Sequence, residues 1–241
     1  MNFEPVIANL PYLLTGAVLT VGISVVAFVM ALVLGLVVAA GRMSRFRAIR
    51  ALSGVYVDVF RSTPVFIQLI WFYYALPILT GLSLDAVTTA TLGLGFAHAA
   101  FYSEIYRTGL LAVPAGQREA ALAQGMTGLQ AMRRILLPQA IRLVIPPMTS
   151  GAVSLVKDSS IASTLAVNEL MFQAGTLNGL IQQPLEVLSI VALIYVTLTY
   201  PLTLLGNRLD DRWRTTGDTR QARWSRRVVV PGTVGGASGA P

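Results

Sequence analysis

The sequence predicts an all-α membrane protein with about five transmembrane helices. Of its 241 residues, 54% are hydrophobic and 12% are charged, and the mean hydropathy is +0.66, which is too apolar for a soluble domain of this length. The longest apolar segments are continuous rather than alternating, which favours helices over a transmembrane barrel. The chain contains no cysteine, so disulfides and thiolate metal sites are excluded.

Each element follows from an apolar run long enough to cross a hydrocarbon layer, which takes about 20 helical residues. The runs cover residues 11–41, 52–79, 86–105, 144–166 and 185–205. The first run is too long for a signal-peptide core, and the residues before it carry Glu4 and no lysine or arginine, so it is predicted to be an uncleaved span. Residues 215–241, rich in arginine, glycine and proline, are predicted to be a disordered tail.

The basic residues predict how the spans are oriented. Every lysine and arginine except Lys157 falls on one side of the layer, whereas the connections 77–85 and 167–184 contain none. The positive-inside rule makes the basic side cytoplasmic, with the amino terminus outside and the carboxyl terminus inside. The pI of about 10.2 therefore reflects topology and contact with anionic lipid in the bilayer, and it does not indicate a nucleic-acid partner.

A polar stretch at 114–140 separates the third and fourth runs and is predicted to fold as two helices joined by a sharp turn. Pro114 suits the start of the first helix, and Gly125 suits its end in a left-handed conformation. Thr127 and Gln130 have the spacing of a capping box, which starts the second helix. Small side chains on this bend would let another protein approach closely. Local composition by itself favours the alternative, an amphipathic helix that lies on the bilayer.

Seven residues of this stretch match a known motif: Glu119, Ala120, Ala121, Gly125, Ile135, Leu137 and Pro138. Their identities and spacing resemble the EAA loop of ABC (ATP-binding cassette) importer permeases. More narrowly, "FRSTP" at 60–64 and "KDSSI" at 157–161 resemble the polar amino-acid permease family of the HisM and GlnP type. The resemblance covers residues 15–209, with mild departures at Ser62, Ser159 and Ala123–Gln124.

The resemblance implies a type I ABC importer permease fold over residues 12–209, with a cytoplasmic coupling loop at 114–140. It implies a multi-pass protein of the cell membrane that works with a second permease subunit, the same or related, two cytoplasmic ATPase subunits and an external solute-binding protein. Residues 119–125 would form the coupling helix that seats in a groove of the ATPase. The cargo would be a polar or charged amino acid or a close analogue.

The sequence independently indicates that ATP hydrolysis belongs to another subunit. It contains no glycine-rich phosphate loop ending in lysine, because its only lysine lies in "SLVKDSS" without a glycine at the required spacing. We therefore expect that the chain is not an enzyme and holds no cofactor, and that ATP and Mg are used by the partner ATPase.

Four polar residues are candidates for a substrate path: Glu104, Lys157, Asp158 and Ser159. Lys157 lies about 22 Å of helix beyond Arg142, so it is well inside the bilayer and needs a partner or a wet cavity. One interpretation is a polar passage that binds the ammonium and carboxylate ends of an amino acid. The other is a structural pair between Lys157 and Glu104. The family resemblance favours the passage.

Three smaller predictions concern contacts within and between helices. Arg107, one turn from Glu104, is its predicted local partner. His98 is predicted to be a hydrogen-bonded helix contact, because no second metal-binding side chain accompanies it, and no metal site is expected. Close helix packing is expected at four glycines of the first run: Gly16, Gly22, Gly35 and Gly41.

Two other classes of protein share some of these features. An ion-coupled secondary transporter also carries charges in the membrane, but it is built from paired halves and needs no docking loop. A membrane scaffold would use the cytoplasmic loop without a polar path. The motif at 119–138 favours the importer permease over both.

Overall fold

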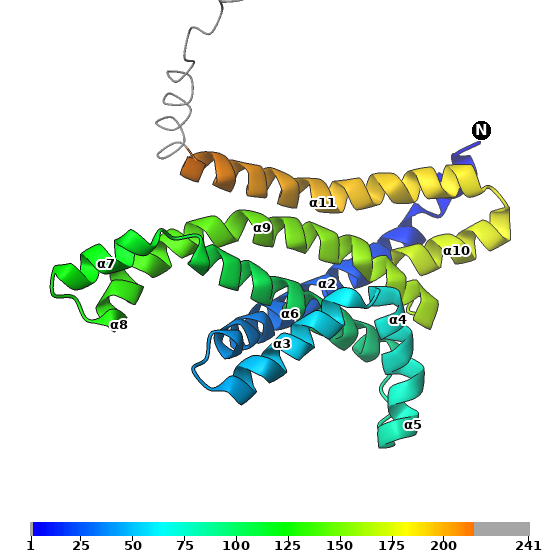
Figure 1. Cartoon of the computed structure of the whole chain (residues 1–241). Helices are drawn as coiled ribbons and strands as arrows, with labels where there is room; N and C mark the ends of the chain where they lie inside the picture. Colours follow the sequence, from blue (N-terminus) through cyan, green and yellow to red (C-terminus); the bar gives the residue numbers. More distant parts are fainter. Residues whose placement is uncertain (1, 215–241) are drawn as a thin grey trace, which may run out of the picture.

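The computed structural model of the protein describes residues 2–214, which form helices and connecting loops without a strand (Figure 1). In chain order the α-helices are α1 (Glu4–Ala8), α2 (Leu10–Arg42), α3 (Arg47–Ser62), α4 (Val65–Ile70), α5 (Leu76–Thr80), α6 (Ala86–Leu111), α7 (Ala115–Ala123), α8 (Gly128–Ala131), α9 (Leu137–Asp158), α10 (Leu170–Ile181) and α11 (Pro184–Arg214). Two π-helical turns, Trp71–Ala75 and Met132–Leu136, and one 3₁₀ helix, Ser159–Leu165, connect some of them. The tail predicted at 215–241 lies outside the described residues.

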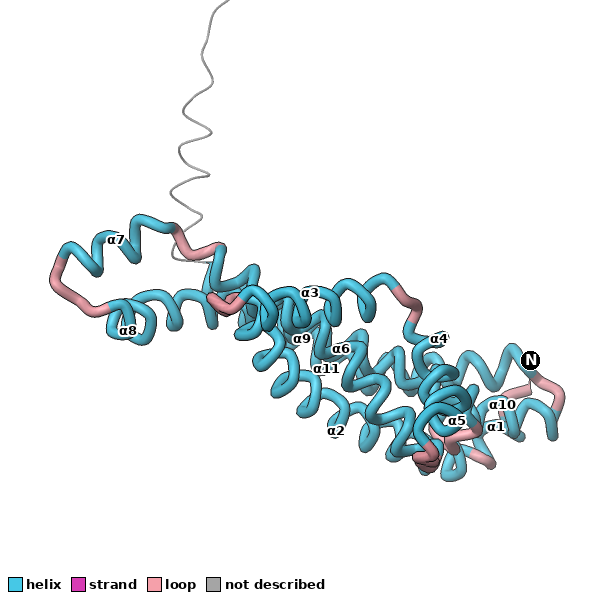
Figure 2. The backbone as a smooth tube through the Cα atoms, turned by 60° about the horizontal axis from the view of Figure 1, so that its bottom comes forward, coloured by secondary structure: helices cyan, strands magenta, loops and turns pink. Residues whose placement is uncertain are grey.

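The long helices pack side by side as a bundle. α2 packs most extensively against α6, α9 lies against both α6 and α11, and α3 covers another side of α6. The bend formed by α7 and α8 projects from one end of the molecule, and α1 and α10 lie at the other end, in both views (Figures 1 and 2). The protein therefore presents its most polar helical segment and its amino terminus at opposite ends.

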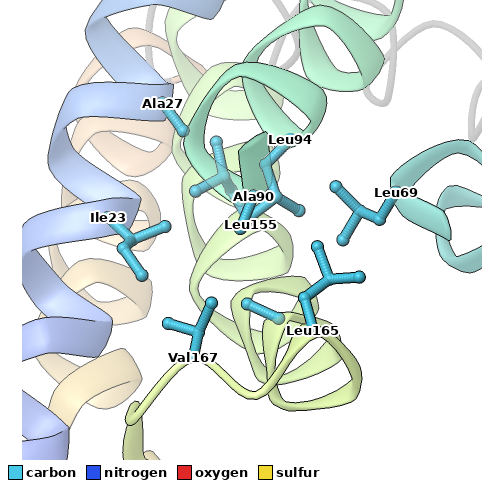
Figure 3. Packing of buried hydrophobic residues seen from close by; sticks show 9 residues of the cluster. Ile23, Ala27, Leu69, Ala90, Leu94, Leu155, Leu165 and Val167 are labelled. Carbon is cyan, nitrogen blue, oxygen red and sulfur yellow. The ribbon is translucent and has the colours of Figure 1, made fainter. Parts of the chain in front are cut away.

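Small and branched apolar side chains hold the centre of the bundle together. Figure 3 shows α2, α4, α6, α9 and the 3₁₀ helix contributing to one cluster, whose labelled members are Ile23, Ala27, Leu69, Ala90, Leu94, Leu155, Leu165 and Val167. Most of these side chains are completely buried. Several are alanines, which lets the helix backbones approach closely, as in other membrane bundles.

The structure supports part of the predicted set of spans. By length and apolar composition, two helices in residues 2–214 can cross a membrane, Leu10–Arg42 and Pro184–Asp211, and a bent pair of helices would make a third. α6 and α9 correspond to the third and fourth predicted runs, but they carry more polar side chains and are not among these two. The total of about five spans stays a prediction.

The second predicted run, 52–79, is not a single straight helix. α3 ends at Ser62, and the helical segment Val65–Thr80 continues at an angle of 108° to it. The cause is local, because a residue before proline is pushed out of the helical region. Thr63, which precedes Pro64, has φ −102° and ψ 131°. Hydropathy alone did not reveal this break, since both sides of it are apolar.

α6 begins at a side-chain cap, and α9 ends where the helical type changes. Asp85 caps α6 by accepting a hydrogen bond from the backbone N–H of Thr88 at 3.0 Å. Hydrogen bonds from Thr88 hold the pKa of the Asp85 carboxyl below its ordinary value. At the other end, α9 stops at Asp158 and the chain tightens into the 3₁₀ helix, so the predicted run 144–166 changes helical type inside its length.

Three of the four glycines predicted for close packing are confirmed. A Cβ added at Gly16, Gly35 or Gly41 would lie 2.5 Å from Gln173 Oε1, 2.9 Å from Tyr102 Cβ and 2.3 Å from Ser53 Oγ, respectively. Gly22 has no atom of another residue within 4 Å of such a Cβ, so the prediction is wrong there. Sequence patterns do not reveal which side of α2 faces a neighbour.

This contrast gives a matched pair of variants in one helix. Gly35→Ala is expected to destabilise the protein by about 1–3 kcal/mol, because the new methyl group meets Tyr102 Cβ and, at 3.0 Å, the backbone oxygen of Ala99. Gly22→Ala is expected to be neutral or slightly stabilising, because alanine is the better helix former and the site is open. The thermal unfolding midpoint of the purified protein measures both. A Gly35→Ala midpoint equal to that of Gly22→Ala would contradict the packing argument.

Candidate functional site

The first candidate site is the bend between α7 and α8. α7 begins after Pro114 and ends with Gly125 at φ +80°, a left-handed conformation that glycine adopts without strain. Two hydrogen bonds close the helix end: Met126 N–H donates to Ala121 O at 3.1 Å, and Gly125 N–H donates to Leu122 O at 3.0 Å. This pair of bonds is the Schellman arrangement. The predicted helix stop at Gly125 is confirmed.

The predicted restart two residues later is confirmed as well. Gln130 N–H donates to Thr127 Oγ1 at 3.3 Å, and Thr127 N–H donates to Gln130 Oε1 at 2.8 Å, so both halves of the capping box are present. α8 is short and runs directly into the π-helical turn Met132–Leu136 and then α9. The bend is therefore fixed by its own backbone and two side chains rather than by a neighbouring helix.

The motif residues on α7 and at its end differ in solvent exposure. Glu119, Ala120 and Gly125 are exposed, whereas Ala121 is buried. Leu122 and Leu129, two large apolar side chains, are also exposed, by 38% and 69%. An exposed surface with small residues, one carboxylate and two leucines suits contact with another protein.

An apolar cluster connects the bend to the bundle. Val113, Leu136 and Ala140 are buried together, with Leu110 and Met132 packed against them. These residues come from the end of α6, the π-helical turn and the start of α9. The ends of α6 and α9 that flank the bend are therefore packed against each other through one cluster.

The second candidate site is the end of α9. Lys157 is exposed on the surface of the single chain, and the Asp158 side chain is 38% exposed. Asp158 Oδ2 lies 3.1 Å from Nε2 of His98 on α6. Ser159 is completely buried, and its hydroxyl donates to Val156 O at 2.8 Å. The predicted path residues at 157–159 thus differ in role: two are accessible and one is enclosed.

Glu104 lies elsewhere on α6. It accepts hydrogen bonds from Arg107, whose Nη2 is 2.8 Å from Oε1, and from Arg42 at the end of α2. The predicted pairing with Arg107 is confirmed, and Arg42 is a second partner. No ion pair joins Glu104 to Lys157 in the described part of the chain. The alternative of a structural pair between these two residues has no support in the geometry.

Three tertiary contacts of polar side chains were not predicted from the sequence. Arg42 was counted only toward orientation, and the hydrogen-bonded contact predicted for His98 had no partner assigned, whereas the structure places Asp158 there. Glu169, expected on an outer connection, is completely buried and accepts hydrogen bonds from Phe172 N–H at 2.8 Å, the Tyr195 hydroxyl at 3.2 Å and the Thr20 hydroxyl at 3.3 Å. No local pattern marks such partners, since they come from distant segments.

Cavities lie between the helices of residues 2–214. A cavity of about 380 Å³ lies at the break between α3 and α4, lined by Val59, Phe60, Thr63, Ile67, Gln68, Trp71 and Phe72. A larger, mainly apolar one of about 670 Å³ lies between α2, α9 and α11. Residues 2–214 contain no group of three or more histidine and acidic side chains suited to hold a metal ion.

Long apolar helices, a polar end of α9 and an exposed helical bend are typical of a membrane transport subunit. The chain belongs to the family of binding-protein-dependent transport system inner membrane components, whose model matches residues 31–215. Members of this family are membrane permease subunits of ABC importers, and a separate subunit hydrolyses ATP. The protein is accordingly a multi-pass membrane component and not an enzyme.

Two relatives from Bacillus subtilis (strain 168) match most of the chain. The arginine transport system permease protein ArtQ is 34% identical over 210 residues, covering 87% of this chain and 96% of its own. The probable glutamine ABC transporter permease protein GlnM is 37% identical over 212 residues, covering 88% and 98%.

Solved structures agree with the fold. A crystal structure of an amino acid ABC transporter with histidines superposes with a TM-score of 0.84 at 29% identity, covering 88% of this chain and 99% of that one. The MetNI methionine ABC transporter in an inward-facing conformation gives a TM-score of 0.71 at 25% identity, covering 85% and 97%. The predicted type I importer permease fold is therefore supported by structure as well as by sequence.

Proposed function

We propose that this chain carries a polar or charged amino acid, or a close analogue, across the cell membrane after an external solute-binding protein delivers it. The observation that carries the proposal is the agreement over nearly the whole chain with permeases named for arginine and glutamine. The opposite placement of the bend and the amino terminus supports a cytoplasmic bend and an outside amino terminus, and α11 ends on the side of the bend, which supports a carboxyl terminus inside (Figure 1).

The bend is the proposed contact with the ATPase. Residues 119–125 would seat as the coupling helix in a groove of one ATPase subunit, with Ile135, Leu137 and Pro138 supporting the entry of α9. The exposed leucines at the bend and the packed cluster at its base support this role, because the first would bury apolar surface on docking and the second would pass movement to α6 and α9. ATP and Mg belong to that partner.

The passage is the proposed place of the substrate. Lys157 is exposed on the single chain, and a lysine facing lipid at this depth costs several kcal/mol. A second permease subunit, the same or related, would cover it and leave a polar passage between the two. Lys157 and Asp158 would meet the carboxylate and the ammonium of the amino acid. Ser159 closes the passage behind them, and Glu104 with its arginines lies nearer the bend.

Reconstitution in proteoliposomes tests the proposed function. Membranes containing the permease, its ATPase and its binding protein are expected to take up at least one of labelled arginine, histidine, glutamine, glutamate and cystine. Uptake should require ATP and survive a protonophore and a sodium ionophore, because no ion gradient drives it. Loss of uptake with ionophores while ATP is present would indicate a secondary transporter, and absence of uptake for the whole panel would contradict the amino-acid assignment.

Lys157→Met tests the passage. The Michaelis constant for the transported amino acid is expected to rise about tenfold, because a charge-assisted hydrogen bond worth roughly 1.5 kcal/mol is removed. Lys157→Arg keeps the positive charge and is expected to retain most of the affinity. Concentration-dependent uptake in the proteoliposomes measures both. An unchanged Michaelis constant for Lys157→Met would show that the lysine has a structural role and does not bind the substrate.

A further inference from the structure

His98 is the only histidine of the chain, and its place in the bundle is unusual. Its side chain is 6% exposed, among the completely buried Ala97, Ala99 and Ala100 of α6. The rings of Phe101 and Tyr102 lie with their centroids 6.1 and 6.4 Å from that of the imidazole. A polar ring enclosed by apolar neighbours needs a hydrogen-bond partner to offset its lost hydration.

That partner is Asp158. The contact of 3.1 Å joins Nε2 of His98 to Oδ2 of Asp158 and spans two helices that are 60 residues apart in the chain. An ionised carboxylate accepts only, so this contact is a hydrogen bond in the tautomer that carries the hydrogen on Nε2. The His98 side chain is 6% exposed and the Asp158 side chain 38%, so a ligand can reach the carboxylate but not the imidazole.

Asp158 lies at a change of helical type. It is the last residue of α9, and the 3₁₀ helix Ser159–Leu165 continues directly from it. Lys157, its neighbour in sequence, points about 100° away around the helix and is not its ion-pair partner among the described residues. His98 therefore supplies the hydrogen bond that orients and stabilises this carboxylate.

We propose that His98 is a positioning residue of the transport path: it holds the Asp158 carboxylate in the orientation that receives the ammonium group of the amino-acid substrate. The proposal rests on the proposed function, in which Asp158 faces the substrate. It assigns to His98 no contact with the substrate itself. The Nε2–H donor, rather than the size of the ring, is the property that matters.

Two substitutions at His98 separate the donor from the packing. His98→Leu replaces the ring with an apolar side chain of similar volume that has no donor, and is expected to raise the Michaelis constant for uptake about fivefold while the maximal rate changes less than about twofold. His98→Gln places an amide N–H near the position of Nε2 and is expected to restore the constant to within about twofold of the wild type. His98→Met serves in place of His98→Leu if that variant is not recovered from membranes.

The measurement uses the complete importer in proteoliposomes. The probe is whichever labelled amino acid of the panel arginine, histidine, glutamine, glutamate and cystine gives the highest ATP-dependent uptake. Asp158→Asn is expected to raise its Michaelis constant at least as much as His98→Leu does. In the Asp158→Asn background, His98→Leu is expected to add less than about twofold, because its effect acts through the carboxylate.

The outcomes distinguish this proposal from the function on which it rests. An impaired Asp158→Asn variant beside a normal His98→Leu variant would overturn the role of His98 alone. Equal losses in His98→Leu and His98→Gln, or effects that multiply in the double variant, would assign His98 to packing. An unchanged Michaelis constant in Asp158→Asn would overturn the path itself and the positioning role together.

Discussion

Gly125→Val is expected to reduce ATP-dependent uptake at least about tenfold while the protein still inserts into the membrane. At φ +80°, a residue with a Cβ costs roughly 1–2 kcal/mol, and a β-branched side chain costs more, so the correctly closed bend becomes a minor conformation. Apart from the two chain neighbours, no residue lies within 4 Å of a Cβ at this position, so the effect comes from the backbone and not from a clash. Uptake and ATP hydrolysis in proteoliposomes measure it.

Two controls isolate the backbone effect. Asparagine tolerates the left-handed region, so Gly125→Asn is expected to retain most of the uptake. Gly128→Ala changes a nearby glycine that starts α8, has ordinary φ and has open space around it, and is expected to transport normally. We expect Gly125→Val to hydrolyse ATP without stimulation by the loaded binding protein. Normal, stimulated uptake by this variant would refute the bend as the coupling element.

Glu104→Gln is expected to lower the thermal unfolding midpoint by about 5 °C. The substitution removes the carboxylate that joins Arg42 of α2 to Arg107 of α6 and leaves two positive charges close together. Breaking one side of an enclosed ion pair costs roughly 3–5 kcal/mol, and about 2 kcal/mol is expected here because the Glu104 side chain is 20% exposed. For a protein of this size, that free energy corresponds to about 4–8 °C.

The unfolding midpoint of the purified protein checks this, with two comparisons. Asp58→Asn removes an exposed carboxylate from α3 and is expected to change the midpoint by less than about 1 °C. The double variant Glu104→Gln with Arg42→Gln removes the unpaired charge as well, and is expected to be more stable than Glu104→Gln alone. A Glu104→Gln midpoint equal to the wild type would show that the ion pair contributes nothing to the packing of α2 on α6.

The bend could be predicted from the sequence because each of its parts is local. The left-handed stop depends on glycine at position 125, and the capping box depends on two side chains three residues apart. The structure has both. Local geometry also accounts for one failure, since the same proline rule that ends helices at X-Pro bonds breaks the second run at Thr63, where apolar composition had suggested continuity.

The tertiary partners of the polar side chains could not be predicted from the sequence. Arg42 and Glu104 are 62 residues apart, and His98 and Asp158 are 60 apart, so each pair forms only when α2, α6 and α9 pack in one register. Glu169 likewise lies on a stretch that looks like an exposed connection, but it is buried against α2 and α11 by tertiary contacts. Sequence spacing shows pairs within one helix, such as Glu104 and Arg107, and no others.

The sequence by itself determined the class of fold, the bend at 114–140 and the family, because hydropathy, turn residues and motif spacing act within a few residues of one another. The tertiary structure decided which faces of the helices meet, which of Gly16, Gly22, Gly35 and Gly41 are needed for that contact, and that Asp158 is held by His98 while Glu104 is held by arginines. The physical reason is that a membrane charge takes the partner that packing brings within hydrogen-bond distance, and packing depends on the whole bundle.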